Sequence, residues 1–291
     1  NFVKNREIKG KMSMDFLSKG TILNGKYKIL NYIAKSDFSN IYLATYRRKK
    51  YVVKECFPAQ LVIRDNEYGV FTNKYKTQFE MVVNSFRKEA EILGRFIHKG
   101  IVDLEDFFEE KGTVYLILEY CEGKTLKEYI LEEDLTEIEV MKIFEEIMEV
   151  IEEIHSKDVI HRDIKPSNII IDKNKNVKII DFGSAITKEE ENGKYVKLTN
   201  GYSPMEMYSV KSKNDERTDI YSLSALLYFM LNKQKPMDSV KRFYYPELLY
   251  EDTVSENARI FIEKGLEQEM KARYENIQEM KEKFKKLNLT E

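Results

Sequence analysis

The sequence that decides the fold is His161-Arg162-Asp163-Ile164-Lys165-Pro166-Ser167-Asn168, which is followed 13 residues later by Asp181-Phe182-Gly183. Between the two motifs lie apolar runs at 169–172 and 177–180, separated by a polar stretch, so a strand, a turn and a second strand are predicted there. Asp and Asn are common turn residues, and each of them alone would be interpreted as a turn former. Their fixed order and interval argue for a functional site instead.

The two motifs resemble the catalytic loop H-R-D-x-K-x-x-N and the metal loop D-F-G of protein kinases. The resemblance implies transfer of the γ-phosphoryl group of ATP, a reaction that depends mainly on positioning and charge compensation. It assigns Asp163 as the acceptor of the substrate hydroxyl's proton and Lys165 as the cation that stabilises the transferring group. Asn168 and Asp181 would be the oxygen ligands of Mg²⁺, a hard cation, with Mn²⁺ as an alternative metal.

A lysine and a glutamate outside these motifs are the next predicted members of the site. Tyr51-Val52-Val53-Lys54 resembles the kinase strand whose lysine contacts the α and β phosphates, although strand alternation alone equally permits an exposed lysine. Glu89 lies in a helix predicted at about 78–96, at the spacing of the glutamate that pairs with that lysine in kinases. A solvated glutamate is the simpler alternative. The resemblance favours the pair Lys54–Glu89 over Lys54–Glu91.

The loop that covers the phosphates departs from the kinase pattern G-x-G-x-x-G-x-V. It reads Ala34-Lys35-Ser36-Asp37-Phe38-Ser39-Asn40-Ile41 and has no glycine. Glycine allows close backbone approach to phosphate and unusual dihedral angles, both of which a Cβ restricts. A weaker ATP affinity or turnover is therefore expected. The resemblance still assigns Ala34, Ser36, Phe38 and Ser39 to the nucleotide, with the serine hydroxyls as predicted donors to phosphate.

The adenine end is assigned from Leu116-Ile117-Leu118-Glu119-Tyr120-Cys121, which resembles the kinase strand that leads into the hinge. Leu118 would be the gatekeeper, and backbone groups of Glu119 and Cys121 would bond the base. The apolar residues predicted to sandwich adenine are Ile41, Val52 and Ile170. Ordinary core packing explains the same apolar residues, since every sheet supplies such side chains.

The run Thr199-Asn200-Gly201-Tyr202-Ser203-Pro204-Met205-Glu206 resembles the substrate-docking segment of kinases. Thr199 matches the threonine that bridges the catalytic aspartate and lysine in serine/threonine kinases. Together with the position of Lys165 two residues after Asp163, this favours serine and threonine hydroxyls as substrates.

Two further contacts follow from the resemblance. Glu206 is expected to pair with Arg273 in the last helical region. Asp219 begins a predicted helix and resembles the kinase residue that fastens the catalytic loop, so its role would be structural.

Composition and charge limit the partners. The 291 residues contain 48 Lys and Arg against 50 Asp and Glu, and the net charge of -2 provides no global field for nucleic acid or anionic lipid. Cys56 and Cys121 are too few for a disulfide framework, which indicates a reducing cytoplasm. The apolar run 221–231 is about half the roughly 20 residues that a bilayer crossing needs, so no membrane segment is predicted, and no secretory leader is expected. The predicted partners are ATP and protein substrates.

The predicted fold class is α+β, a bilobal fold similar to that of protein kinases. An arm over 1–19 precedes an N-lobe over 20–120, with a small antiparallel β-sheet and one main helix, and a large helical C-lobe covers 121–291. A nucleotide site between the lobes is expected. Lys54-Glu55-Cys56-Phe57-Pro58 and Ile63-Arg64-Asp65 are similar to the bacterial branch of the serine/threonine kinases, although 57–77 is longer than most kinases need.

An active kinase is the preferred function, and other interpretations stay open. The glycine-free loop and Met205, which replaces the usual proline, are also typical of a pseudokinase or scaffold that binds nucleotide weakly and acts by docking a partner. Small-molecule phosphotransferases of related fold usually lack D-F-G. We also hypothesise that Glu189, Glu190 and Glu191 replace an activation-loop phosphate near Arg162, against the simpler interpretation of a solvated acidic run. A homodimer is left open.

Overall fold

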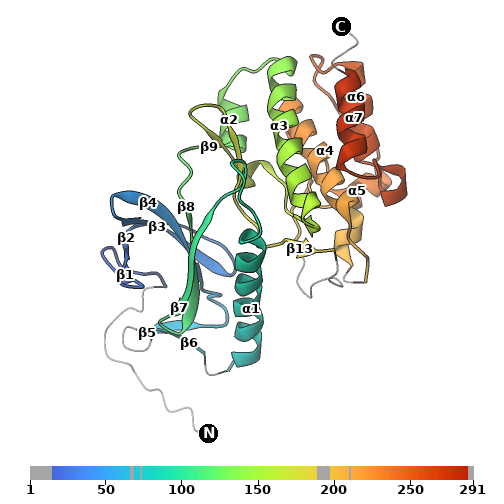
Figure 1. Ribbon diagram of the computed structural model, residues 1–291. Helices are drawn as coiled ribbons and strands as arrows, with labels where there is room; N and C mark the ends of the chain where they lie inside the picture. Colours follow the sequence, from blue (N-terminus) through green and yellow to red (C-terminus); the bar gives the residue numbers. More distant parts are fainter. Residues whose placement is uncertain (1–14, 66–68, 73, 189–196, 210, 288–291) are drawn as a thin grey trace. The chain divides into compact units, whose positions relative to one another are not determined.

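The computed structural model describes residues 15–65, 69–72, 74–188, 197–209 and 211–287. The chain divides into two compact units, which we describe separately. The sheet unit comprises Asn1–Ala90 and Leu104–Tyr120, and the helical unit comprises Glu91–Asp103 and Cys121–Glu291. Strands dominate the first unit and helices the second (Figure 1), so the predicted α+β class is confirmed.

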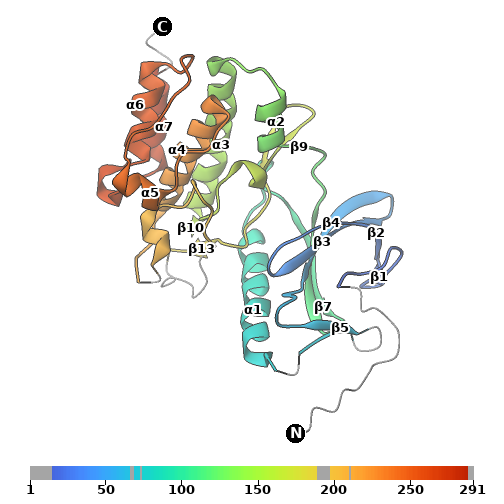
Figure 2. The ribbon, with the colours of Figure 1, turned by 180° about the vertical axis from the view of Figure 1, so that it is seen from behind.

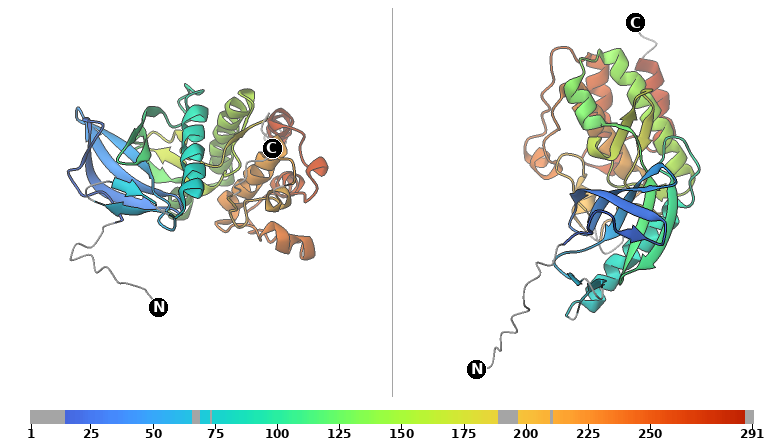
Figure 3. Two further views of the ribbon diagram at one scale, coloured as in Figure 1. Left: turned by 90° about the horizontal axis from the view of Figure 1, so that it is seen from below. Right: turned by 90° about the vertical axis from the view of Figure 1, so that its left-hand side faces the viewer.

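The sheet unit is built on six antiparallel strands in the order β1-β2-β3-β4-β8-β7. Figure 3 shows that this sheet is twisted, as the geometry of extended L-residues requires. Strands β2, β3 and β4 form an antiparallel meander, and β7 begins at Leu104, after Ile101 has formed a bridge with Ile179 in the helical unit. The strands are β1 (Ile22–Leu23), β2 (Tyr27–Lys35), β3 (Ser39–Tyr46), β4 (Lys49–Cys56), β7 (Leu104–Glu110) and β8 (Thr113–Glu119).

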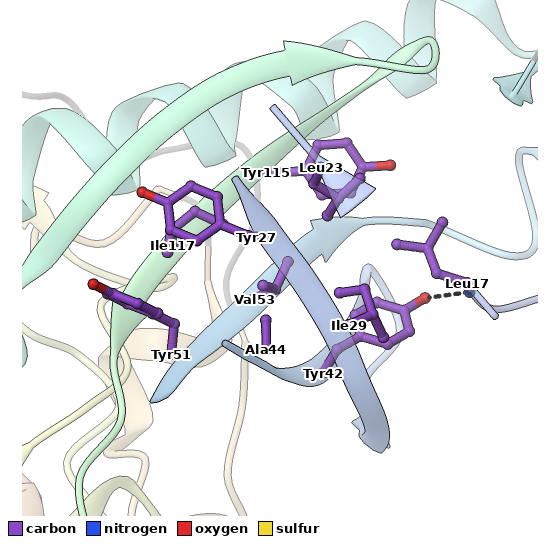
Figure 4. Close-up of a cluster of buried hydrophobic side chains, with 10 residues drawn as sticks. All are labelled: Leu17, Leu23, Tyr27, Ile29, Tyr42, Ala44, Tyr51, Val53, Tyr115 and Ile117. Atoms are coloured by element: carbon purple, nitrogen blue, oxygen red, sulfur yellow. Dashed lines mark hydrogen bonds between the residues drawn. The ribbon is translucent and has the colours of Figure 1, made fainter. Parts of the chain in front are cut away.

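One face of the sheet is covered by a hydrophobic core, shown in Figure 4. Burial alternates along β4, because Tyr51 and Val53 are buried in this core while Val52 and Lys54 are only half-buried. The Leu17 N–H donates to the Tyr42 hydroxyl at 3.1 Å, so the end of the segment predicted as an arm packs on the sheet. The core residues are Leu17, Leu23, Tyr27, Ile29, Tyr42, Ala44, Tyr51, Val53, Tyr115 and Ile117.

A hairpin occupies the long junction after β4. Strand β5 (Ile63–Asp65) pairs with β6 (Gly69–Phe71). Phe57 is buried with Val62, which precedes the hairpin, and with Val70 of β6. Phe79 of helix α1 (Lys76–Leu93) packs against the same cluster. Helix α1 runs beside the sheet (Figure 1). The junction therefore connects β4 to α1 through apolar packing.

Four helices pack together in the helical unit: α3 (Glu137–Ser156), α4 (Glu216–Asn232), α6 (Glu256–Gly265) and α7 (Ile277–Leu287). Figure 2 shows them side by side, with strands β10 (Val159–Ile160) and β13 (Ile186–Thr187) near one end of α3 and α4. Helix α3 begins with a capping box, in which the Thr136 hydroxyl accepts the Glu139 N–H and the Glu139 carboxylate accepts the Thr136 N–H.

A small sheet in the helical unit connects the two sequence motifs. Strand β11 (Ile169–Asp172) follows the first motif and pairs with β12 (Val177–Ile179), which precedes the second. Strand β9 (Gly123–Thr125) completes the order β12-β11-β9. The predicted strand, turn and strand are therefore confirmed.

Two helices were missed by the sequence analysis. Helix α2 (Leu126–Glu132) has the same signature as α3, since Thr125 and Glu128 form a capping box at its start. Helix α5 (Ser239–Tyr244) has only 6 residues, too few for a periodic apolar pattern. Among the residues that the structure describes, no helix has the length and apolar character to cross a bilayer.

Candidate active site

Lys54 and Glu89 meet in the sheet unit. The Lys54 Nζ donates to both Glu89 carboxylate oxygens, at 2.6 and 2.8 Å, and the Phe86 ring lies 5.5 Å from the same ammonium. The pair is shielded, because the two side chains are only 14% and 3% exposed. Glu91 instead pairs with Arg95 at 3.0 Å. The predicted choice of Glu89 over Glu91 matches these contacts.

The register of the sheet places predicted nucleotide residues on the face of Lys54. Ile41 lies opposite Lys54 in the β3–β4 pair, and Val52 lies opposite Leu118 in the β4–β8 pair. Because side chains alternate along strands, Val52 and Lys54 lie on one face, away from the core of Figure 4. Glu119, opposite Tyr51, ends β8.

The glycine-free loop closes as a tight turn between β2 and β3. The Ser36 N–H donates to the Ser39 carbonyl at 2.8 Å, and the Ser36 hydroxyl accepts the Ser39 N–H at 3.2 Å. The two serine hydroxyls also bond each other at 2.7 Å, so one hydroxyl proton is used inside the turn, which limits their predicted role as donors to phosphate. Among the described residues, those with positive φ lie outside 34–41. Since this turn needs no left-handed residue, its Cβ atoms cause no backbone strain.

Asp219 fixes the start of the catalytic motif in the helical unit. Its buried carboxylate accepts the N–H groups of His161 and Arg162, both at 2.8 Å. Arg162 has a φ of 62°, a left-handed conformation that is unfavourable for a side chain of this size. The two hydrogen bonds to a buried carboxylate offset this strain, so the expected fastening contact is present.

His155 contacts the carboxylates of Asp219 and Glu216. Its Nε2 lies 2.8 Å from Asp219 Oδ2, and its Nδ1 lies 3.4 Å from Glu216 Oε2. Burial opposes protonation, but the two carboxylates outweigh it and raise the pKa of His155 to about 9. The contact with His155, aided by Lys188, lowers the pKa of Glu216 to about 2. A protonated histidine therefore lies between two carboxylates beneath the catalytic loop.

Asp163 is the centre of the polar cluster in the loop. Its Oδ1 accepts from Lys165 Nζ and from the Thr199 hydroxyl, both at 2.8 Å. Its Oδ2 accepts from Lys165 at 2.8 Å and from the Asn168 amide at 3.0 Å. Lys165 Nζ also lies 3.2 Å from the Thr199 hydroxyl, so the predicted bridge by Thr199 is present. Burial with charged donors fixes this carboxylate in one orientation.

Asn168 and Asp181 are brought together by pairing of the two motifs. The Ile180 N–H donates to the Asn168 carbonyl at 3.0 Å, which sets the residue after Ile180 beside Asn168. The Asn168 amide nitrogen donates to the Asp163 carbonyl at 2.9 Å, and its side-chain oxygen faces away from that bond. Asp181 Oδ1 accepts the Gly183 N–H at 3.1 Å. The amide oxygen of Asn168 and the carboxylate of Asp181 are hard donors of the kind that Mg²⁺ prefers.

Aromatic packing fixes the second motif against the first. The Phe182 ring contacts His161 edge-on at 4.9 Å between centroids, and Phe96 at 5.6 Å. Burial lowers the pKa of His161 and favours the neutral ring, whose Nδ1 accepts the Asp163 N–H at 3.3 Å. The sequence analysis assigned no role to Phe96. Phe96 lies at the end of the apolar pattern that predicts a helix at about 78–96, and this pattern does not indicate a contact with Phe182.

The outer end of the docking segment is fixed as expected. Arg273 donates to both Glu206 oxygens, at 2.7 and 3.0 Å, and its side chain is fully buried.

Ile170 of β11 is half-buried and Cys121 is partly exposed, both in the helical unit. Their predicted contacts with adenine stay predictions.

Arg162 is the described residue of the activation-loop hypothesis. Its Nε donates to the Ser184 carbonyl at 2.8 Å, while Nη1 is buried without a hydrogen-bond partner among the described residues. Burial lowers the pKa of Arg162. Glu189, Glu190 and Glu191 lie outside the described residues, so their role stays a hypothesis.

A shielded pair between a strand lysine and a helix glutamate, together with a loop carrying aspartate, lysine and asparagine, defines the protein kinase class of fold and site. The model of the protein kinase domain family matches residues 64–285. The chain therefore belongs to the protein kinase family.

Known relatives agree with this assignment. Serine/threonine-protein kinase PrkC of Bacillus subtilis (strain 168) is 30% identical over 228 residues, which are 75% of this chain and 32% of that protein. Aurora kinase B of Danio rerio is 30% identical over 243 residues, 80% of this chain and 71% of that protein. The solved structure of PpkA-294 in its apo form is 26% identical, with a TM-score of 0.79 over 93% of this chain and 100% of that one.

The matches identify a serine/threonine protein kinase domain and confirm the predicted enzyme class and bilobal kinase fold. None of them favours the scaffold alternative. The chain spans about a third of the length of the first curated relatives it matches. As a member of this family, the chain is expected to use ATP, a divalent metal and protein substrates.

Proposed function

We propose that this domain transfers the γ-phosphoryl group of ATP to a serine or threonine hydroxyl of a protein. The observation that supports this best is the set of contacts around Asp163. Lys165 and Thr199 fix its carboxylate from one side, and Asn168 fixes it from the other. A carboxylate held in one orientation is suited to accept the proton of an attacking hydroxyl.

Lys54 is the proposed phosphate contact of the sheet unit. Its ion pair with Glu89 holds the ammonium in place, and a fixed cation stabilises phosphate charge without further reorganisation. The proposed contacts to the rest of the nucleotide are Ala34, Ser36, Phe38, Ser39, Ile41, Val52, Leu118, Glu119, Cys121 and Ile170.

Asn168 and Asp181 are the proposed ligands of Mg²⁺, with Mn²⁺ as the alternative. Their oxygen donors fit a hard cation, and Mg²⁺ commonly takes its other ligands from phosphates and water. When bound, the metal neutralises charge on the phosphates.

We also propose a cytoplasmic location and protein partners. Cys56 and Cys121 do not form a disulfide with each other, which agrees with a reducing compartment. The net charge of -2 argues against nucleic acid as a partner. The homodimer stays an untested option.

The proposal is tested with radiolabelled ATP, Mg²⁺ and a generic basic protein. The wild-type domain should label serine and threonine, as phosphoamino-acid analysis would show. Asp163→Asn should reduce the rate by roughly 10²–10⁴-fold, since it removes the proton acceptor. Lys54→Met should raise the KM for ATP and reduce the rate. Equal labelling by wild type and Asp163→Asn would refute the proposal.

A further inference from the structure

Lys197 contacts the two carboxylates on which the proposed reaction depends. Its Nζ lies 3.1 Å from Asp163 Oδ2 and 3.6 Å from Asp181 Oδ2. The Lys197 side chain is 39% exposed, whereas that of Asp163 is only 2% exposed. All three residues belong to the helical unit. One ammonium from the docking segment thus lies on both the proposed proton acceptor and a proposed metal ligand.

Lys197 crowds one oxygen of the Asp163 carboxylate. Oδ1 accepts from Lys165 and Thr199, and Oδ2 accepts from Lys165 and Asn168. Lys197 approaches Oδ2 in addition to these donors, so Oδ2 is the more crowded oxygen. A substrate hydroxyl that approaches Oδ2 competes with Lys197, and withdrawal of Lys197 opens that approach.

Lys197 is the donor that can leave with least disturbance. Lys165 is half-buried within the catalytic loop, and Asn168 is buried there and also bonds the Asp163 backbone. Thr199 is anchored by its N–H, which donates to the Ser203 hydroxyl at 2.8 Å. Lys197 comes two residues earlier and has a long side chain that is well exposed.

The same ammonium competes with a cation at Asp181. Asp181 Oδ1 accepts the Gly183 N–H, and Oδ2 is the oxygen that faces Lys197. A divalent cation on Oδ2 would lie within a few ångström of the Lys197 charge, and like charges at such a distance repel strongly where water is partly excluded. The ammonium and the metal therefore exclude each other.

We propose that Lys197 is an autoinhibitory cation, which occupies Asp163 and Asp181 in the resting domain and must withdraw before a divalent metal and a substrate hydroxyl can bind. This inference rests on the proposed kinase function and adds a regulatory step to the same site. The resting state is the one described here. In the competent state the Lys197 side chain turns into solvent, while Thr199 keeps its bonds to Asp163 and Lys165.

The test is direct binding of Mn²⁺, followed by electron paramagnetic resonance of the free ion, without nucleotide and with a non-hydrolysable ATP analogue. Lys197→Met should bind Mn²⁺ roughly three- to tenfold more tightly, because removal of a competing state raises the competent fraction. The Mg²⁺ concentration for half-maximal labelling should fall by a similar factor. Lys197→Arg keeps the charge and should stay near wild type.

Lys188→Met is the matched control. Lys188 also contacts two carboxylates, Asp158 at 3.2 Å and Glu216 at 2.6 Å, and its side chain is 37% exposed. The Lys188→Met variant should bind Mn²⁺ with unchanged affinity. If Lys197→Met binds Mn²⁺ no more tightly than wild type, or Lys188→Met tightens binding equally, the autoinhibitory role is wrong.

Asp181→Asn separates failure of this inference from failure of the proposed function. Loss of Mn²⁺ binding in Asp181→Asn supports the metal site, and an unchanged affinity in Lys197→Met then refutes only the role of Lys197. Undiminished Mn²⁺ binding in Asp181→Asn would overturn the metal role of Asp181 and the autoinhibitory role together.

Discussion

Two fully buried carboxylates, Glu55 in the sheet unit and Asp219 in the helical unit, act on their surroundings in different ways. Asp219 accepts backbone N–H groups of His161 and Arg162 and so sets the path of a loop. Glu55 accepts only side-chain donors among its described hydrogen bonds. These donors are Asn40 at 3.2 Å, Tyr42 at 2.7 Å, Arg64 at 2.7 Å and Tyr115 at 2.9 Å.

The difference separates a carboxylate that positions catalytic groups from one that holds strands together. Glu55 follows Lys54 in β4, but alternation turns it to the opposite face, where it joins β3, β8 and the hairpin after β4. Asp219 lies far from Asp163 in sequence, yet it accepts the N–H of Arg162, the residue directly before Asp163. Loss of Asp219 should therefore affect catalysis and stability, and loss of Glu55 mainly stability.

The largest effect is expected for Asp219→Asn. The substitution removes the charge that faces protonated His155 and weakens the acceptor for two backbone N–H groups. The free energy of unfolding should fall by about 3–5 kcal/mol, as for one partner of a buried ion pair, and the rate per folded molecule should fall sharply. Urea unfolding and initial rates measure the two. Asp158→Asn, at a 71% exposed side chain, is the control. A loss no larger than in this control would contradict the comparison.

Glu55→Gln should have the next largest effect on stability. It leaves the Arg64 guanidinium, whose side chain is 8% exposed, without its anionic partner, and about 3 kcal/mol should be lost. The rate per folded molecule, measured well below the melting temperature, should stay close to wild type. The double variant Glu55→Gln, Arg64→Met should lose much less free energy of unfolding than the two single variants lose together, because the two groups interact directly. An activity loss like that of Asp219→Asn would break the comparison.

The pH dependence of stability should report on the carboxylates around His155. The folded pKa of about 9 lies above the ordinary value near 6.5, so the stabilisation is complete below about pH 6.5 and is lost as the pH rises to about 9. The expected contribution is on the order of 2 kcal/mol. The melting temperature should fall over this range in wild type and less in His155→Gln. Glu216→Gln should lessen the fall, and equal slopes in all three proteins would contradict the assignment.

The smallest effect distinguishes the two tyrosines that bind Glu55. Tyr115→Phe removes one donor and should cost about 1 kcal/mol. Tyr42→Phe should cost more, because the Tyr42 hydroxyl both donates to Glu55 and accepts the Leu17 N–H. Chemical denaturation of both variants measures the difference. If Tyr115→Phe is the more damaging change, the hydroxyl contacts do not determine the stability of this network.

Much of the candidate site followed from local sequence. The spacing of Asp163, Lys165, Asn168 and Asp181 is short, and the strand, turn and strand between the motifs allow little choice of geometry. The partner of Lys54 followed from the resemblance to the kinase helix, which favoured Glu89 over Glu91. Helix α2 was missed although its capping box was legible at Thr125 and Glu128.

The contacts that escaped prediction all join distant segments. Glu55 was noted only as part of a motif, because nothing in a strand pattern tells which donors will surround a buried carboxylate. Lys197 was indistinguishable from other surface lysines until the fold placed it on Asp163 and Asp181. The serine turn in the phosphate loop was likewise invisible, since hydroxyl partners depend on how the chain closes.

The sequence by itself determined the family, the α+β class and the residues of the catalytic motifs, because fixed local spacing and side-chain periodicity are properties of the chain. Only the tertiary structure decided that Glu55 is a polar anchor, that two carboxylates raise the pKa of His155, and that Lys197 contacts Asp163 and Asp181. Burial and charge neighbours arise when segments far apart in sequence come together, and these determine the energy of an ionisable group.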